Sequence, residues 1–164
     1  MSQAISTTWV RPPRSLLTAA GRAIGDYHMI RNGDRILLGL SGGKDSLALL
    51  HTLHHLQQKA PVEFELLACT VDPQSDEYDP SPLKPYLAGL GVPYFLESQP
   101  IVADAQRTLT RDSDSFCAYC SRMRRGILYR VAREQGCNVV ALAQHLDDLS
   151  ETLMMSMLFG GKLR

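Results

Sequence analysis

Short apolar runs alternate with longer segments of helical periodicity along this chain. Four runs predict strands, at residues 35–40, 64–71, 93–98 and 138–144. The first of them is almost continuously apolar, as expected of a strand that is buried on both faces. Apolar residues at intervals of three and four predict helices at residues 14–30, 45–59, 81–91, 120–136 and 147–159. The polar residues 99–116 are predicted to be irregular.

The alternation of strands and helices predicts an α/β fold, because parallel strands are joined by right-handed helical crossovers. We therefore expect a Rossmann-like three-layer sandwich with a parallel sheet. At 164 residues the chain has the length of one domain. Residues 1–13, which include Pro12 and Pro13, are expected to form a loose arm before a domain of residues 14–164.

The 17 basic and 17 acidic side chains cancel, so the net charge argues neither for nor against a nucleic-acid partner. No apolar run approaches the roughly 18–20 residues of a membrane span, and the N-terminus lacks the apolar core of a secretory signal. A cytoplasmic protein with no membrane partner is the expectation. The thiols are then expected to be reduced at Cys69, Cys117, Cys120 and Cys137. The core is expected to be filled in part by Met154, Met155 and Met157.

Polar clusters follow three of the four predicted strands. Ser41–Ser46 follows the first strand, Asp72 ends the second, and His145–Asp148 follows the fourth. Ligands of open parallel sheets bind beyond the carboxyl ends of the strands. The sequence therefore predicts one binding pocket at this edge of the sheet.

The segment after the first strand reads Ser-Gly-Gly-Lys-Asp-Ser and has the features of a phosphate-binding loop. Gly42 and Gly43 let backbone N–H groups approach an anion, and the following helix presents its positive end. Ser41 and Ser46 add hydroxyl donors, and Lys44 adds a mobile cation.

Two common nucleotide motifs are excluded at this loop. A Walker loop would require glycine at Leu38 and serine or threonine at Asp45, and the dinucleotide pattern would require glycine at Ser41. A carboxylate beside bound phosphates needs an intervening cation, and Mg²⁺ is the usual one. The alternative is that Asp45 only satisfies free N–H groups at the start of the helix.

The loop resembles the PP-loop of the ATP pyrophosphatase group, within the adenine-nucleotide alpha-hydrolase superfamily. Members cleave ATP between the α and β phosphates, adenylate a carbonyl or amide oxygen and release pyrophosphate. The resemblance implies that residues 41–46 bind ATP, with Lys44 and Asp45 as catalytic residues. It also implies Mg²⁺ near Asp45 and Asp148, and a nucleotide that faces His145, Asp148 and Asp72. A plain helix-capping role for Asp147 or Asp148 is the alternative.

Cys117 and Cys120 have the spacing that lets one metal ion or cluster take both thiolates. Two unrelated thiols are the alternative interpretation. Neither Cys69, in a predicted strand, nor Cys137, at the far end of a predicted helix, is a convincing further ligand. The residues alone leave the site incomplete.

Residues 117–136 and 141–164 resemble the tRNA 2-thiocytidine synthetase branch of the PP-loop group. The resemblance implies ATP-dependent thiolation of a cytidine in the anticodon loop of tRNA, through a [4Fe-4S] cluster. Cys117 and Cys120 would be two cluster ligands, and a third, later cysteine is expected outside this sequence. Members of this branch extend past the equivalent of Arg164. A sulfur-delivering protein such as a cysteine desulfurase is the implied partner, and a homodimer is left open.

The predicted helix 120–136 is densely basic, with arginines at Arg122, Arg124, Arg125, Arg130 and Arg133. Such runs are often solvated faces balanced by acids such as Glu134. The functional interpretation is contact with tRNA phosphates, for which Arg122 and Arg125 are preferred because they lie nearest the cysteine pair.

Two other functions remain open from the sequence. A tRNA lysidine synthetase shares the loop and a His-x-Asp-Asp motif like that of residues 145–148. It needs no thiol, so the cysteine pair disfavours this function. A nucleotide-binding protein of the universal-stress type would bind ATP without turnover, and the complete loop with Asp45 disfavours that reading.

Overall fold

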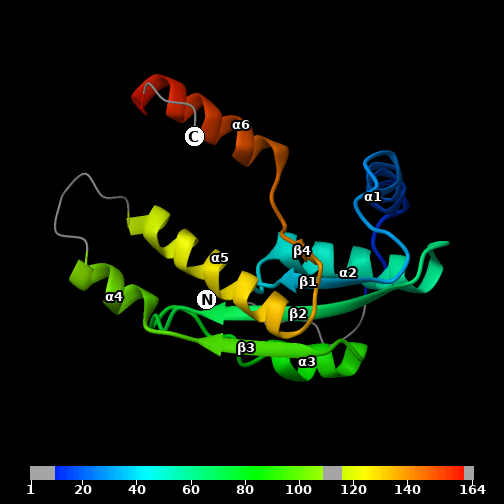
Figure 1. Ribbon diagram of the computed structural model, residues 1–164, viewed down its shortest axis with the longest axis horizontal. Coiled ribbons are helices and arrows are strands. Elements are labelled where there is room, and N and C mark those ends of the chain that lie inside the picture. The colour runs from blue at the N-terminus through cyan, green and yellow to red at the C-terminus, as the bar shows by residue number, and fades with distance from the viewer. Residues whose placement is uncertain (1–9, 109–115, 161–164) are drawn as a thin grey trace.

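The computed structural model describes residues 10–108 and 116–160. Its centre is a four-stranded sheet in the order β3-β2-β1-β4, in which every neighbouring pair is parallel (Figure 1). The strands are β1 (Asp34–Gly39), β2 (Phe64–Asp72), β3 (Tyr94–Ser98) and β4 (Val139–Ala141). The predicted parallel α/β sheet is confirmed.

Helices cover both faces of the sheet. The α-helices are α1 (Arg14–Asp26), α2 (Lys44–Lys59), α3 (Leu83–Leu90), α4 (Ile101–Thr108), α5 (Phe116–Glu134) and α6 (Leu146–Met155), and a π-helical turn, η1, spans Ser156–Gly160. Helices α2 and α3 pack on one face, and α4 and α5 on the other (Figure 1). The three predicted layers are thus present. Helix α1 packs against α2 rather than against the sheet.

Strand β1 supplies side chains to two separate apolar cores. Ile36 and Leu38 pack with α2 and α3, whereas Leu37 points to the opposite core beneath α4 and α5. None of the three side chains is exposed to solvent. A central parallel strand must be apolar on both faces, and this explains the nearly unbroken apolar run in the sequence.

The prediction for residues 99–116 is wrong within the described part of that segment. Residues Ile101–Thr108 form helix α4, and α5 begins at Phe116 rather than at Cys120. Helix α4 is held by Ile101 and Ala105, which lie one turn apart and are 1% and 0% exposed. Two apolar positions among polar residues give only a weak periodic signal, so packing decides this helix more than its sequence pattern does.

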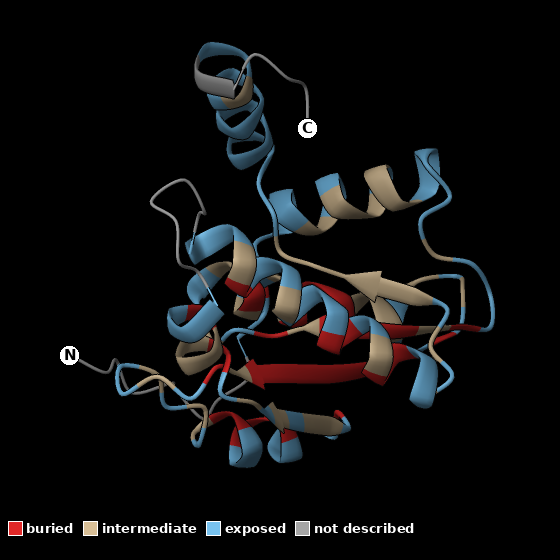
Figure 2. Ribbon diagram, turned by 60° about the vertical axis from the view of Figure 1, so that its left-hand side comes forward, coloured by how far each residue is buried: buried red, intermediate tan, exposed pale blue. Residues whose placement is uncertain are grey.

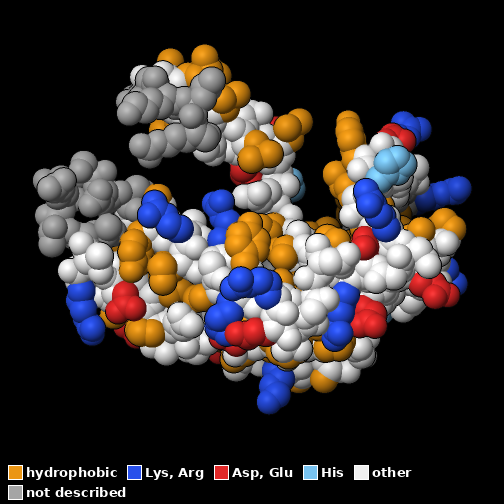
Figure 3. All heavy atoms as spheres, in the orientation of Figure 1, with side chains coloured by type: hydrophobic (Ala, Val, Ile, Leu, Met, Phe, Trp, Pro, Cys, Tyr) orange, Lys and Arg blue, Asp and Glu red, His pale blue; other side chains and the backbone are white. Residues whose placement is uncertain are grey.

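Helix α6 stands apart from the sheet, and none of its residues is buried (Figure 2). The expectation that Met154, Met155 and Met157 fill the core is therefore wrong, because each is more than half exposed. Figure 3 shows apolar side chains gathered on the surface of α6. None of the helices in the described ranges has the length and apolar character required to cross a bilayer.

Asp34 and Asn138 connect the start of β1 to the start of β4. The carboxylate of Asp34 accepts hydrogen bonds from the backbone N–H of Arg31 at 2.6 Å and from the Asn138 amide at 2.7 Å. The Asn138 side-chain oxygen accepts in turn from the Arg35 N–H at 2.8 Å. These donors, with the Arg31 N–H as the largest cause, lower the pKa of Asp34.

We predict that Asp34 makes the free energy of unfolding depend on pH in acid. Its folded pKa lies below the unfolded value of 3.8, so the ionised carboxylate stabilises the fold above that pH. This contribution is lost as the pH falls through the lowered pKa. Asp34→Asn should reduce stability at neutral pH and flatten the acid decline, measured by urea unfolding across pH. Asp26→Asn, at an exposed carboxylate, is the control; equal acid slopes in the wild type and Asp34→Asn would contradict the prediction.

Candidate functional site

The chain leaves β1 through a turn that is fixed by hydrogen bonds to β2. The backbone N–H of Leu40 donates to the Cys69 carbonyl at 2.9 Å, and the Thr70 hydroxyl donates to the Leu40 carbonyl at 2.7 Å. Leu40 and Thr70 are 2% and 0% exposed. The loop that follows is thus held at the carboxyl edge of the sheet, where the sequence predicts the pocket.

The Ser-Gly-Gly-Lys-Asp-Ser loop is ordered by its own serines. The Ser46 hydroxyl donates to the Gly43 carbonyl at 2.9 Å, and the Ser41 hydroxyl contacts that of Ser46 at 3.1 Å. Gly42 has φ +79°, a left-handed conformation that glycine adopts without strain. Ser46 is 4% exposed, so its hydroxyl stabilises the loop from inside. Its predicted contact with phosphate stays a prediction.

The N-terminus of α2 faces solvent at this loop. Its N-cap residue is Gly43, and no side chain caps the helix there. The first N–H groups of an uncapped helix, together with the helix dipole, form a natural anion site. Lys44 is exposed and forms no salt bridge within the described parts of the chain. The geometry therefore offers backbone donors and a cation to a negatively charged ligand.

His145 brings two of the predicted acidic residues together. Its Nε2 lies 3.1 Å from Oδ1 of Asp45 at the start of α2, and its backbone N–H donates to Oδ2 of Asp148 at 3.0 Å. Asp148 therefore has the helix-capping role that the sequence left open, at the start of α6. Among the residues described, no three His, Cys, Asp or Glu side chains converge enough to hold a metal ion. A cation between Asp45 and Asp148 would thus need oxygen atoms from phosphates as further ligands.

Asp72 ends β2, as expected, and both of its carboxylate oxygens have partners. Oδ1 accepts from the Gln74 N–H at 2.8 Å, and Oδ2 accepts from the Ser98 hydroxyl at 3.0 Å. Gln74 has φ +56°, so the carboxylate stabilises an unusual turn after the strand. The structure gives Asp72 a role in shaping the rim, and its contact with adenosine stays a prediction.

Tyr78 is a residue of this site that the sequence analysis missed. Its hydroxyl donates to the Ser41 carbonyl at 3.1 Å, which fastens the β2–α3 connection over the loop. Burial is the largest cause that raises the pKa of Tyr78 to about 12, and Tyr94 and Asp72 add to it while Arg124 opposes it. The phenol therefore remains a donor at neutral pH. A lone tyrosine in a polar connection carries no motif, so only the fold brings it to the loop.

The cysteine pair occupies the first turns of α5. Cys117 is exposed, and Cys120 is 9% exposed and packs in the core beneath the helix. Residues three apart lie on the same side of a helix. Cys69 is fully buried in β2, where burial is the largest cause that raises its pKa to about 12, and Cys137 lies past the far end of α5.

The arginines of α5 divide into paired and unpaired groups. Arg130 contacts Glu97 at 2.5 Å and Glu134 at 3.1 Å, so it is part of a balanced surface network. Within the described residues, Arg122 and Arg125 form no salt bridge, and they line a groove of about 710 Å³ between α5 and α6. The groove is lined by Thr152 of α6 and by seven residues of α5, which are Cys117, Ala118, Ser121, Arg122, Arg125, Gly126 and Tyr129. The two preferred arginines therefore share a concave surface with Cys117.

The parallel sheet, with a glycine loop and an uncapped helix N-terminus at its carboxyl edge, indicates the class of protein to which the chain belongs. The sequence pattern of the PP-loop domain family matches residues 16–164, and the chain belongs to this family. The tRNA-cytidine(32) 2-sulfurtransferase of Burkholderia mallei strain SAVP1 is 43% identical over 151 residues, which cover 92% of this chain and 45% of that protein. The protein of the same name from Burkholderia pseudomallei strain K96243 is similar to the same extent. The chain thus spans less than half the length of the curated relatives that it matches.

Solved structures agree with this class. The U34-tRNA thiolase NcsA from Methanococcus maripaludis, solved with its [4Fe-4S] cluster, has a TM-score of 0.71 at 26% identity. The match covers 89% of this chain and 49% of that chain. An NH3-dependent NAD synthetase from Campylobacter jejuni has a TM-score of 0.57 at 17% identity over 92% of this chain and 61% of its own, which shows a shared fold. The predicted PP-loop membership is confirmed.

We predict that the cysteines differ strongly in reactivity in metal-free protein. Cys117 is exposed and should react first with iodoacetamide, whereas Cys69 is buried and its pKa of about 12 leaves almost no thiolate at pH 8. Peptide mass spectrometry after brief labelling measures the order. Protein unfolded in urea, in which all four thiols should react, is the control. Labelling of native Cys69 at the rate of Cys117 would contradict the described burial.

Proposed function

We propose that this chain carries out the ATP-dependent step of tRNA thiolation at C2 of a cytidine. The C2 oxygen attacks the α phosphorus of ATP, the bond between the α and β phosphates breaks, and pyrophosphate leaves. Sulfur then replaces the oxygen, which departs with AMP. The relatives named tRNA-cytidine(32) 2-sulfurtransferase, at 43% identity, support both the substrate and the reaction.

The PP-loop residues are proposed to bind and release the pyrophosphate. The free N–H groups at the start of α2 and the Lys44 ammonium are donors for the β and γ phosphates. These groups stabilise the negative charge that develops on the leaving pyrophosphate. Ser41, Gly42, Gly43 and Ser46 keep the loop in the shape that exposes those N–H groups.

Asp45 and Asp148 are proposed to hold Mg²⁺ against the phosphates. Within the described residues, each carboxylate has one oxygen that His145 does not contact, because His145 meets Oδ1 of Asp45 and Oδ2 of Asp148. One or two carboxylates plus phosphate oxygens are the usual protein contribution to a Mg²⁺ site. His145 would position both acids, and Asp72 would support the adenosine side of the pocket.

Cys117 and Cys120 are proposed to be two ligands of a [4Fe-4S] cluster. Their spacing and their position on the first turns of α5 fit two ligands of one cluster, of which Cys117 is exposed and Cys120 is held at the edge of the core. The described residues supply no third ligand near them. When bound, the cluster would supply the sulfur chemistry. Arg122 and Arg125, unpaired beside Cys117, would bind phosphates of the tRNA.

One observation carries the proposal: a PP-loop and a cysteine pair with one exposed member, Cys117, occur on one domain. The loop alone would also suit a lysidine-forming enzyme or a nucleotide-binding protein without turnover. Only sulfur transfer needs the thiols as well. The tRNA thiolase that matches this fold was solved with a [4Fe-4S] cluster, which supports that choice.

We predict that Lys44→Ala lowers the rate of pyrophosphate release by at least about 100-fold, the size of effect seen when one donor to a developing charge is removed. Release of AMP and pyrophosphate from ATP, with unmodified tRNA present, is the measurement. Lys59→Ala, at the opposite end of the same helix, is the control and should behave as wild type. Production of ADP and orthophosphate by the wild type would contradict the proposed bond cleavage.

We predict that Cys117→Ser with Cys120→Ser abolishes thiolation but leaves ATP affinity unchanged. The cysteines lie on α5 and the loop precedes α2, so the two functions are on separate elements. Cluster content by absorption, thiocytidine by mass spectrometry of tRNA digests and ATP affinity by calorimetry are measured on anaerobically prepared protein. Cys137→Ser is the matched control. Retained thiolation in the double variant would contradict sulfur transfer through this pair.

A further inference from the structure

The groove between α5 and α6 contains a glycine, Gly126, that the packing of the chain does not explain. Gly126 lies at the middle of the 19-residue helix α5 and is exposed in the groove. A Cβ atom built on Gly126 would have no atom within 4 Å, so no neighbouring side chain requires a glycine there. A glycine inside a helix costs about 0.5–1 kcal/mol relative to alanine. A glycine at this position leaves the helix backbone open to close approach by another molecule.

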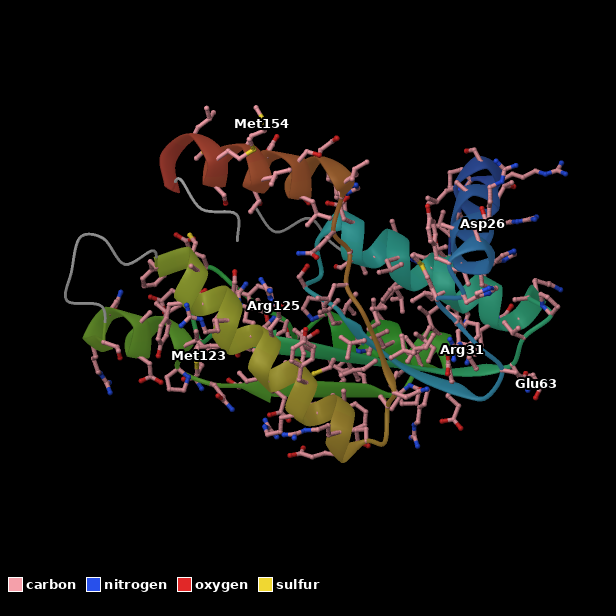
Figure 4. All side chains as sticks on the ribbon, turned by 45° about the horizontal axis from the view of Figure 1, so that its top comes forward. Asp26, Arg31, Glu63, Met123, Arg125 and Met154 are labelled. Atoms are coloured by element: carbon pink, nitrogen blue, oxygen red, sulfur yellow. The ribbon has the colours of Figure 1, made fainter. Side chains whose placement is uncertain are left out.

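The charge on this side of α5 is left unbalanced. Arg122 and Arg125 lie in the groove without an acidic partner among the described residues, while Arg130 is neutralised by two glutamates. Figure 4 shows Arg125 on the edge of α5 that is turned toward α6, opposite the edge that carries Met123. The opposite wall contributes the uncharged Thr152, and the acidic residues of α6, which are Asp147, Asp148 and Glu151, are not among the residues that line the groove. The groove is thus complementary to a polyanion.

An aromatic ring lies at the other end of the groove from the cysteines. Tyr129 is 52% exposed and lines the groove one turn beyond Arg125. From Cys117 to Tyr129 the helix rises roughly 18 Å, at about 1.5 Å per residue. This length matches a short run of nucleotides rather than a single base. An exposed ring beside arginines is the combination that binds unpaired bases, because every base has a face that stacks.

We propose that the groove binds a single-stranded segment of RNA that runs along α5 over Gly126. Arg122 and Arg125 bind its phosphates, and Tyr129 stacks on a base a few nucleotides from the one presented at Cys117. Bases inside an RNA helix are stacked on each other, so Tyr129 selects an unpaired loop. This inference rests on the proposed function and adds to it how the loop is held.

The first test fills the groove without disturbing the fold. Gly126→Leu places a side chain in open space and improves helix propensity, so the variant should fold at least as well as wild type. Its affinity for a fluorescent stem–loop RNA with an unpaired loop, measured by anisotropy with the full chain, should fall at least about tenfold. Gly89→Leu is the matched control, since Gly89 is also exposed in a helix with nothing within 4 Å. It should leave the affinity unchanged.

The second test removes the stacking surface alone. Tyr129→Ala should weaken binding of the same RNA by roughly 5- to 100-fold, whereas Tyr129→Phe keeps the ring and should bind as wild type. Tyr27→Ala is the control, because Tyr27 is 75% exposed at the end of α1. A fully double-stranded RNA should bind more weakly than the stem–loop and should not distinguish wild type from Tyr129→Ala.

The outcomes separate this inference from the proposed function. If the wild type binds the stem–loop and both Gly126→Leu and Tyr129→Ala bind it equally well, the groove is not the path of the RNA, although the enzyme assignment stands. If the wild type binds no RNA while it still binds ATP, the proposed tRNA substrate falls together with the groove. A loss in Gly126→Leu and Tyr129→Ala with unchanged ATP affinity supports the groove.

Discussion

The burial of β1 on both faces is the constraint on which the site depends. The strand carries its apolar side chains into two cores at once, so it cannot shift along the sheet without exposing one of them. At its end, the hydrogen bonds of Leu40 with Cys69 and Thr70 fix the point where the chain turns. The glycine loop and the start of α2 follow this turn directly, so the turn also fixes their position. A rigid sheet edge thereby presents an otherwise flexible glycine segment in one arrangement.

Helix α5 combines a structural and a chemical face. Its inner face, which includes Ile127, Leu128 and Val131, packs on the sheet, and Cys120 lies at the edge of that core. Its outer face exposes Cys117 and the two unpaired arginines. Because Cys120 is anchored by packing and Cys117 is free, the pair is positioned by the core and is still accessible. This arrangement suits a site that must hold a group firmly and meet a large substrate.

Much of the fold follows from the sequence because its strongest signals are periodic. The apolar run of β1, the glycine loop and the helical rhythm of α2 each predict the element that is found. Helix α4 was missed, since only Ile101 and Ala105 anchor it. The methionines of α6 and η1 were misplaced because an apolar helix looks the same in sequence whether or not a sheet lies beneath it. Apolar content alone does not say what a helix packs against.

The residues of the candidate site also fall into those that the sequence reveals and those that only the fold reveals. Residues 41–46 and the pair Cys117 and Cys120 stand out by local spacing, so the sequence was sufficient to find them. Tyr78 and the contact between His145 and Asp45 join residues that are far apart along the chain. No local pattern marks such contacts, because the fold alone determines which loops meet. The division of the arginines of α5 into paired and unpaired sets likewise depends on Glu97, which lies in strand β3.

The position of His145 places it next to two separate surfaces of the molecule. Its ring touches Asp45 at the mouth of the nucleotide loop, while its backbone begins α6, the helix that forms one wall of the groove. A single side chain thus joins the first turn of α2 to the N-cap position of α6. The helix that lines the groove opposite α5 therefore begins in contact with the loop at the carboxyl edge of the sheet.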